Sequence, residues 1–224
     1  SGGRGRSPQN WAIMLGAKAF SVSIFFIDPG IDSGDVIDTC VFPIEPNDDI
    51  ASSYAKLVYL TADMVVKAWT TGALAERRAS PQPKNGLYLP QRIPSDGAID
   101  WTRSANDICA FVRALTRPYP GAFTHLESET VRVWRARTFD LKHEISDLEP
   151  GQIIMTLSNG CFVVAAGSGL VLVDEHEYEA RPLALGDYFT SVSFVKQMKA
   201  IVARHREKYP DLPLSKEILI AADR

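Results

Sequence analysis

The sequence has little cysteine and no long apolar run, and both absences restrict the class of protein. Its three cysteines, Cys40, Cys109 and Cys161, are isolated from one another and lie in apolar surroundings. The cysteines are therefore expected to be reduced and to lie in the core. Neither a metal site nor a redox pair is expected. No stretch reaches membrane-spanning length, and no charged segment followed by a signal-like apolar stretch opens the chain. We expect a cytoplasmic globular protein without a membrane partner.

Histidine is also scarce, and the sequence identifies no catalytic partner residue for any of the four histidines. They are His125, His143, His176 and His205, all in the second half of the chain. A lone histidine without such a partner is expected to be a surface residue or a satisfied polar residue. The composition, 46% hydrophobic and 23% charged over 224 residues, is sufficient for one or two domains with real cores.

The densest group of polar residues lies between two expected strands. Apolar, β-branched and aromatic runs at 21–27 and 36–42 predict neighbouring strands. The loop between them, Asp28–Asp35, contains three acids and two glycines. Gly30 and Gly34 permit positive φ angles and close backbone approach, so a carboxylate can be held beside a pocket there. A polar or calcium-like turn with a purely conformational role is the alternative.

A basic loop precedes this region and leads into a short expected helix. Arg4 and Arg6 flank a glycine, Ser7 is the expected N-cap, Pro8 is the first helical residue and Gly16 is the C-terminal stop. An arginine-rich loop at a helix N-terminus favours the binding of an anion.

These segments together resemble one family. R-G-R-S-P-Q-N-W-A-I, which begins at Arg4, and then D-x-G-I-D-S-G-D-V-I, which begins at Asp28, resemble the folate-dependent formyltransferases. That family includes methionyl-tRNA formyltransferase and the sugar N-formyltransferases. Downstream, the segment 92–101 (R-I-P-S-D-G-A-I-D-W) and the segment 111–122 (F-V-R-A, then R-P-Y-P-G-A) resemble the start of the family's C-terminal domain. The matching segments span most of residues 4–175.

The resemblance implies a reaction and a set of site residues. In the family, a primary amine attacks the formyl carbon of N10-formyltetrahydrofolate, and an Asn, a His two residues later and an Asp serve the reaction. Asp32 matches that Asp and is the expected catalytic residue, which holds and electrostatically supports the histidine. The resemblance also implies that the pterin end of the folate is lined by Pro29, Gly30, Ile31 and Asp32.

The Asn and His of the family belong to an N-x-H segment several residues before Arg4. The printed sequence begins at Ser1 and contains neither of them. We therefore expect these 224 residues to be a fragment without formyl transfer activity of their own.

Charge bears on the identity of the acceptor. From Arg92 to Glu179 the sequence has 8 Lys or Arg and 13 Asp or Glu, a net charge of 8 − 13 = −5. Because binding to RNA needs a basic face, tRNA is disfavoured and a nucleotide-linked amino sugar is favoured. The expected acceptor-binding residues are Arg4, Arg6, Arg113 and Tyr119.

Three alternatives stay open beside the sugar N-formyltransferase. They are a methionyl-tRNA formyltransferase, a formyltetrahydrofolate hydrolase that uses the same loop without an acceptor pocket, and a non-catalytic folate-binding or assembly module. A homodimer is also possible.

The expected fold class is α/β, with four segments. Residues 1–75 resemble the C-terminal part of a Rossmann-like formyltransferase domain, 76–91 form a linker, 92–190 form an OB-like barrel of five short strands and 191–224 form a helical tail. A long amphipathic helix is expected from Asn47 to Gly72. Its face toward the sheet is expected to consist of apolar and aromatic residues at helical spacing: Ile50, Tyr54, Leu57, Val58, Val65 and Trp69.

Overall fold

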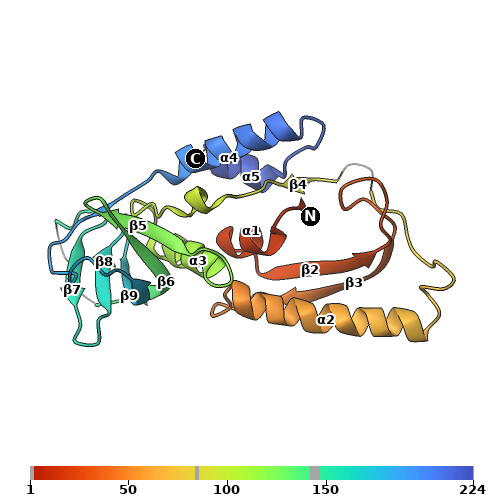
Figure 1. The fold of residues 1–224 in the computed structure, drawn as a ribbon, viewed down its shortest axis with the longest axis horizontal. Helices are drawn as coiled ribbons and strands as arrows, with labels where there is room; N and C mark the ends of the chain where they lie inside the picture. Colours follow the sequence, from red (N-terminus) through yellow and green to blue (C-terminus); the bar gives the residue numbers. More distant parts are fainter. Residues whose placement is uncertain (1–2, 84–85, 142–146, 224) are drawn as a thin grey trace. The chain divides into compact units, whose positions relative to one another are not determined.

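The computed structural model describes residues 3–83, 86–141 and 147–223 (Figure 1). Contacts divide the chain into two units, which are described separately. One unit contains the residues up to Arg92 together with Ile201–Asp223, and the other contains Ile93–Ala200. The expected segments 1–75, 76–91, 92–190 and 191–224 remain a prediction, because a grouping of contacts does not test which part folds independently. None of the described helices is both long enough and apolar enough to cross a membrane.

The first unit is built on a β-hairpin and a long helix. Strands β2 (Ala19–Phe25) and β3 (Val36–Pro43) pair antiparallel, with Phe20 opposite Phe42. Helix α2 (Ile50–Thr70) packs along this hairpin, as Figure 1 shows. The helix begins as a capping box, in which Asp49 accepts a 2.8 Å hydrogen bond from the Ser52 N–H and Ser52 accepts one from the Asp49 N–H.

The face by which α2 packs on the hairpin differs from the expected one. Ile50, Ser53, Met64 and Ala68 are its buried residues, whereas Trp69 is 75% exposed. The expectation that the aromatic residues of this helix lie in the core is therefore wrong for Trp69. Apolar residues occur on both the buried and the exposed side of α2. Their spacing alone therefore could not identify the buried side.

Short elements complete the first unit. They are β1 (Arg4–Gly5), α1 (Pro8–Met14), β4 (Tyr88–Leu89) and α5 (Lys216–Asp223). β1 and β4 pair parallel, with Arg4 opposite Tyr88. The backbone of Tyr88 also bonds to the residues before α5, since its N–H donates to the Pro213 carbonyl at 2.8 Å and its carbonyl accepts from the Ser215 N–H at 3.1 Å.

Helix α1 begins at Pro8, after Ser7, as the sequence predicts, but without a capping bond from the serine side chain. Ser7 adopts a left-handed conformation, with φ at 51°, and makes no side-chain cap bond to the helix. The next residues hold α1 in the core instead, because Gln9 donates to the hydroxyl of Ser53 at 3.0 Å and Trp11 donates to the Pro90 carbonyl at 2.9 Å. Ser7 is therefore the N-cap residue by position, as expected, but its side chain does not cap the helix.

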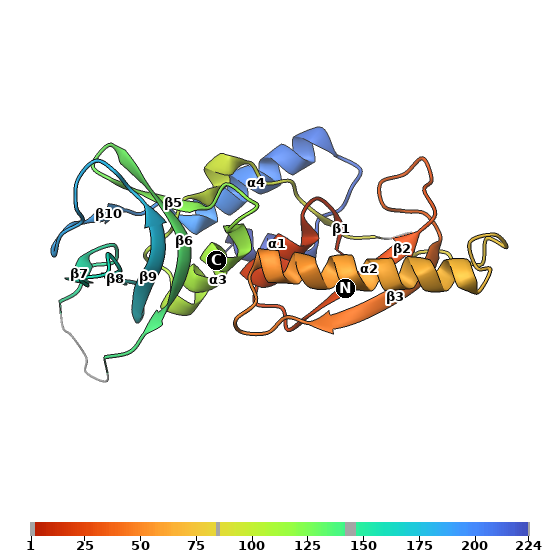
Figure 2. The same ribbon diagram turned by 60° about the horizontal axis from the view of Figure 1, so that its bottom comes forward.

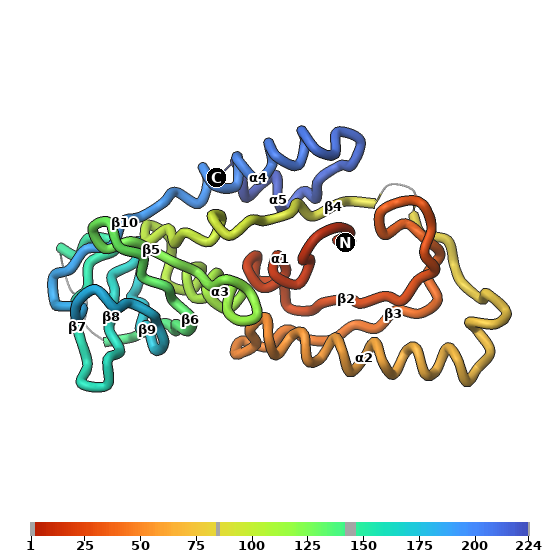
Figure 3. The backbone as a smooth tube through the Cα atoms, viewed as in Figure 1, coloured from red at the N-terminus to blue at the C-terminus, as the bar shows by residue number. Residues whose placement is uncertain are grey.

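The second unit is a curled antiparallel sheet with a helix packed on it. The sheet order is β10-β5-β6-β9-β8-β7, and the tube of Figure 3 follows these strands. Their bounds are Ala122–Leu126 (β5), Glu129–Phe139 (β6), Ile153–Thr156 (β7), Phe162–Ala165 (β8), Leu170–Glu177 (β9) and Phe189–Thr190 (β10). An isolated bridge between Gln152 and Tyr188 brings the first and last strands together, so the sheet curls toward closure.

Three helical segments accompany the sheet. A short 3-10 turn (Pro94–Gly97) precedes α3 (Ala105–Leu115), which Ser104 caps and which packs on β6. Helix α4 (Phe194–Lys208) begins in the second unit and ends in the first. The sequence predicts α4 as the tail helix but does not predict α5.

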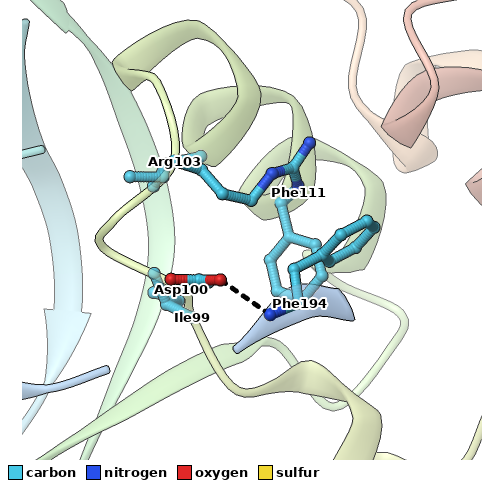
Figure 4. A pocket seen from close by; sticks show the side chains of 6 residues that line it. Ile99, Asp100, Arg103, Phe111 and Phe194 are labelled. Atoms are coloured by element: carbon cyan, nitrogen blue, oxygen red, sulfur yellow. Dashed lines mark hydrogen bonds between the residues drawn. The ribbon is translucent and has the colours of Figure 1, made fainter. Parts of the chain in front are cut away.

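The segment D-G-A-I-D-W is part of the core of the second unit. Trp101 is fully buried, donates to the hydroxyl of Thr124 at 3.1 Å and stacks on Phe189. Asp100 accepts from the Phe194 N–H at 2.7 Å, as Figure 4 shows, and so holds the start of α4. Arg103 lies over the Phe194 ring at 4.0 Å. The segment therefore has an architectural role in this chain.

Asp100 is expected to stabilise the second unit through its charge. Burial opposes its ionisation, but hydrogen bonds from Thr102, Phe194 and Ser191 outweigh burial and place its pKa below the usual value. Asp100→Asn should lower the free energy of unfolding by about 1–3 kcal/mol near neutral pH. Because the folded-state pKa is depressed, this difference should persist above about pH 4 and vanish as the pH falls through the folded-state pKa.

Urea unfolding at several pH values measures this difference. Asp147→Asn is the matched control, since Asp147 is exposed in the same unit and its side chain makes no hydrogen bond or ion pair within the described residues. An effect of Asp100→Asn no larger than that of the control would contradict the assignment.

Candidate functional site

The acid-rich loop Asp28–Asp35 connects β2 to β3, as the sequence predicts. The hairpin pairing continues one step into it, since the Phe26 N–H donates to the Asp35 carbonyl at 3.0 Å. Gly34 is buried, and a Cβ atom there would lie 1.7 Å from the Phe26 carbonyl oxygen. Glycine is therefore required at this position because the backbone itself occupies the space of a side chain.

Asp32 points from this loop to strand β1. Its Oδ2 accepts a 2.8 Å hydrogen bond from the Gly5 N–H, and the side chain is half-buried. Its φ angle is 49°, in the left-handed region that Asp and Asn tolerate better than most residues. Its Oδ1 accepts no hydrogen bond from any residue that the structure describes. The loop thus presents a fixed carboxylate with one oxygen available.

Two residues that the sequence analysis missed hold the Asp32 backbone. Gln82 donates to the carbonyls of Asp32 and Gly34, at 3.1 and 2.6 Å, and Tyr88 donates to the Ile31 carbonyl at 3.2 Å. Both come from the segment expected to be only a linker. No local pattern signals them, because they lie about fifty residues along the chain from the loop.

Asp28 has a different role in the same loop. Its Oδ1 accepts hydrogen bonds from the Gly30 N–H at 3.0 Å and from the Ser33 hydroxyl at 2.8 Å. This pattern is an Asx-type turn, in which a short acid stabilises the local backbone. The exposed residues Pro29, Gly30 and Ile31 form the outer rim of the turn. Their expected folate contacts stay a prediction.

The Gln82 side chain is expected to restrict opening of the loop. Gln82→Ala removes two hydrogen bonds to the loop carbonyls, so we expect amide exchange at residues 30–34 to become about tenfold faster. Hydrogen–deuterium exchange of the folded protein measures this. The control is Gln91→Ala, because Gln91 is exposed and makes no hydrogen bond within the described part of the chain. Equal exchange rates in the two variants would show that Gln82 does not hold the loop.

The predicted acceptor-binding residues fall in both units. Arg4 is half-buried and donates to the Pro83 carbonyl at 2.9 Å, and Arg6 is exposed. Both flank Gly5, so the fold places them beside the Asp32 carboxylate. Arg113 and Tyr119 belong to the second unit, in α3 and in the turn after it. Whether all four act on one ligand remains a prediction.

Arg113 lies next to Cys109, one turn earlier in α3. Burial raises the pKa of the Cys109 thiol to about 11, and the positive charge of Arg113 opposes the shift only in part. This cysteine is therefore a protonated core residue at neutral pH. The described residues contain no group of acids, cysteines and histidines that could hold a metal ion.

The histidines that the structure describes are accounted for by packing. His205 is buried and its Nε2 lies 2.9 Å from the Leu212 carbonyl. His176 packs edge-on against Phe162, and burial lowers its pKa. His125 packs against Phe123 in the same manner. His143 lies outside the described residues.

Two of the three arginines of β6 are paired with acids of β9. Arg135 binds Glu175 at 2.9 Å and Arg137 binds Asp174 at 3.1 Å. Arg117, which precedes the strands, binds Glu175 at 2.6 Å. Hydrogen bonds from Arg117 and Arg135 hold the pKa of Glu175 below its usual range. The charges of Arg117, Arg135 and Arg137 are therefore neutralised within the protein, whereas Arg132 donates to the Pro120 carbonyl.

Comparisons with known proteins agree with this architecture. Residues 93–192 match the family model described as "Formyl transferase, C-terminal domain". A methionyl-tRNA formyltransferase of Pelotomaculum thermopropionicum is 31% identical over 83% of this chain and 58% of its own length. The chain thus spans little more than half of that curated relative.

Solved structures share the fold at low sequence identity. HypX from Aquifex aeolicus, in complex with tetrahydrofolic acid, has a TM-score of 0.65 and 16% identity over 95% of this chain and 44% of its own. The N-formyltransferase from Helicobacter canadensis, in complex with folinic acid and dTDP-3-aminofucose, has a TM-score of 0.53 and 16% identity over 78% of this chain and 62% of its own. At these identities the likeness establishes the fold alone.

The curled sheet and the helix packed on it make up the part of the chain that matches the formyl transferase C-terminal domain. The chain belongs to the formyltransferase family.

Proposed function

We propose that this protein transfers a formyl group from N10-formyltetrahydrofolate to the primary amine of a nucleotide-linked amino sugar. The amine nitrogen attacks the formyl carbon, the bond from that carbon to N10 breaks, and the proton that the amine loses ends on N10 of the leaving tetrahydrofolate. Such a reaction needs a base for the amine proton and a donor for the oxyanion of the tetrahedral intermediate.

The Asp32 carboxylate is the observation that carries this proposal. One oxygen is fixed by the Gly5 N–H, and the other has no partner within the described residues. A carboxylate held in this way can orient an imidazole and stabilise its protonated form. We assign that role to Asp32, with the imidazole and the oxyanion donor supplied by the N-x-H segment that the resemblance places before Arg4.

We place the pterin end of the folate along Pro29–Asp32. Three of these residues are exposed, so the rim of the loop is open to a ligand.

We also interpret the first unit as the C-terminal part of a Rossmann-like domain and the second as an OB-like barrel. The bridge between Gln152 and Tyr188 supports the second interpretation, because it brings the edge strands of the sheet together.

The paired charges of the second unit favour a small acceptor over tRNA. Binding to RNA depends on unpaired cations that displace counterions from phosphates. Here Arg117, Arg135 and Arg137 already bind acids of β9. A nucleoside diphosphate needs only one or two arginines at its phosphates. The candidates are Arg4, Arg6 and Arg113, with Tyr119 as a stacking surface.

Methionyl-tRNA is the second candidate acceptor, and two observations favour it. The curated relative described above is a methionyl-tRNA formyltransferase. In addition, α4 carries exposed cations, namely Lys196, Lys199, Arg206 and Lys208.

Titrations with both ligands separate these acceptors. We expect a thymidine-diphosphate amino sugar to bind with a weak dependence on salt, because about two phosphates are neutralised. Arg113→Ala should weaken this binding by about 1–3 kcal/mol if its guanidinium contacts phosphate. The control is Arg181→Ala, because Arg181 is already paired with Asp187. Tight tRNA binding with a steep salt dependence, and no sugar-nucleotide binding, would reverse the order of the two acceptors.

A further inference from the structure

Strand β4 holds the loop that carries Asp32 by two separate attachments. The first is the ring of Tyr88, whose hydroxyl donates to the Ile31 carbonyl at 3.2 Å. The second is β1, which pairs with β4 and whose Gly5 N–H donates to Asp32. A Cβ atom at Gly5 would lie 2.8 Å from a carbonyl oxygen of β4, so β1 lies directly against this strand. The position of β4 therefore affects the position of the Asp32 carboxylate.

The other edge of β4 pairs with the C-terminal segment Ile201–Asp223, which belongs to the same unit. The Tyr88 N–H donates to the Pro213 carbonyl at 2.8 Å, and the Tyr88 carbonyl accepts from the Ser215 N–H at 3.1 Å. Leu214 lies opposite Tyr88 in a parallel bridge. Figures 1 and 2 both show the blue C-terminal segment beside the yellow segment that contains β4. Strand β4 thus lies between β1 and the C-terminal segment.

The C-terminal segment is held in place by its own buried residues. His205 of α4 is buried, and its Nε2 lies 2.9 Å from the Leu212 carbonyl, in the turn that leads to the residues paired with β4. Leu214 and Ile218 are buried as well. The segment lies beyond residues 93–192, which match the family model. It therefore extends past the matched domain and packs on the unit that contains the Asp32 loop.

We propose that the C-terminal segment positions the Asp32 loop, and that Tyr88 is the positioning residue through which it acts. The inference rests on the proposed role of Asp32 in formyl transfer. Hydrogen bonds to Pro213 and Ser215 fix the main chain of Tyr88, and its rigid ring carries this constraint to the Ile31 carbonyl. The Tyr88 side chain is buried, so packing restricts its ring to this orientation.

Hydrogen–deuterium exchange of the 224-residue chain tests this support without an activity assay. Ser215→Pro removes the backbone donor to the Tyr88 carbonyl, and the matched control Ser215→Ala keeps it. Both variants lose the hydroxyl that accepts the Ile218 N–H at 3.4 Å. We expect the amides of residues 30–34 to exchange about fivefold faster in Ser215→Pro than in the control, because β4 loses one hydrogen bond. Equal exchange in the two variants would overturn the proposal.

Tyr88→Phe tests the part played by Tyr88, because it removes only the hydroxyl. It should speed exchange at residues 30–34 by about fivefold, whereas Tyr59→Phe, at an exposed tyrosine of the same unit, should have no effect. If the segment acts through Tyr88, Ser215→Pro should add less in the Tyr88→Phe background than in wild type. Fully independent effects of the two substitutions would overturn the role of Tyr88.

Kinetics of a protein that also contains the N-x-H segment separate positioning from a structural role. Tyr88→Phe should lower kcat by about fivefold when Asp32 is present and leave it unchanged in an Asp32→Asn background, because a residue that acts through the carboxylate has no effect once the carboxylate is lost. An equal loss in both backgrounds would overturn the positioning role. Near-wild-type turnover of Asp32→Asn alone would contradict the proposed function instead, and the exchange rates would still decide whether the segment holds the loop.

Discussion

The Asp32→Asn variant is expected to lose formyl transfer by about 10²–10⁴-fold in kcat while it keeps its fold. The substitution is suited to this position because the Asn carbonyl can still accept the Gly5 N–H and because Asn tolerates the φ of 49°. The charge is removed, and the second carboxylate oxygen is replaced by an amide NH2 group, which donates hydrogen bonds instead of accepting them. If Asp32 stabilises the protonated state of an imidazole, that stabilisation is lost with the charge.

Steady-state kinetics of a protein that also contains the N-x-H segment measure this effect, and thermal unfolding checks that the fold is kept. The matched control is Asp35→Asn, which neutralises an exposed acid of the same loop whose side chain makes no hydrogen bond within the described residues. We expect the control to keep at least about half of the wild-type kcat, since an exposed charge is screened by solvent and salt. Near-wild-type turnover by Asp32→Asn would remove Asp32 from the catalytic assignment.

The Gly34→Ala variant is expected to have the largest effect on stability. An added Cβ would lie 1.7 Å from the Phe26 carbonyl oxygen and 2.9 Å from its carbon, both of them backbone atoms that cannot rotate away. The β2–β3 hairpin must therefore distort, and the Gln82 hydrogen bond to the Gly34 carbonyl is lost with it. We expect the free energy of unfolding to fall by about 3 kcal/mol or more.

Gly30→Ala is the control for this variant. Its added Cβ would meet the Ser33 hydroxyl oxygen at 2.0 Å, but that atom is the end of a side chain that can rotate. The cost should stay near one hydrogen bond, about 1 kcal/mol. Chemical denaturation of both variants tests the difference, and equal losses would show that the loop adapts to a side chain at either glycine.

Local patterns were sufficient to predict the elements around the site. The β-branched runs on both sides of the loop predict β2 and β3, and the acids at the start of α2 predict its N-terminus, where Asp49 forms the capping box. Both signals depend on residues adjacent in the chain. The placement of Asp32 on the loop between the strands follows from the same patterns.

The partners of the Asp32 loop could not be predicted in this way. Gly5, Gln82 and Tyr88 reach the loop through tertiary contacts, and hydrogen bonds between residues far apart in sequence leave no periodic signal. The buried side of α2 was also ambiguous, because apolar residues occur on both of its sides. Trp69 was assigned to the core by its type, whereas the structure exposes it.

The fate of the formyl carbon tests the central claim most directly. A protein that contains this chain and the N-x-H segment would be supplied with N10-formyltetrahydrofolate labelled at the formyl carbon. The assay would be run with and without a nucleotide-linked amino sugar. Formyl transfer predicts that the label appears as the formamide of the sugar and that little formate is released when the amine is omitted. Formate released at the same rate without the amine would show a hydrolase and contradict the account.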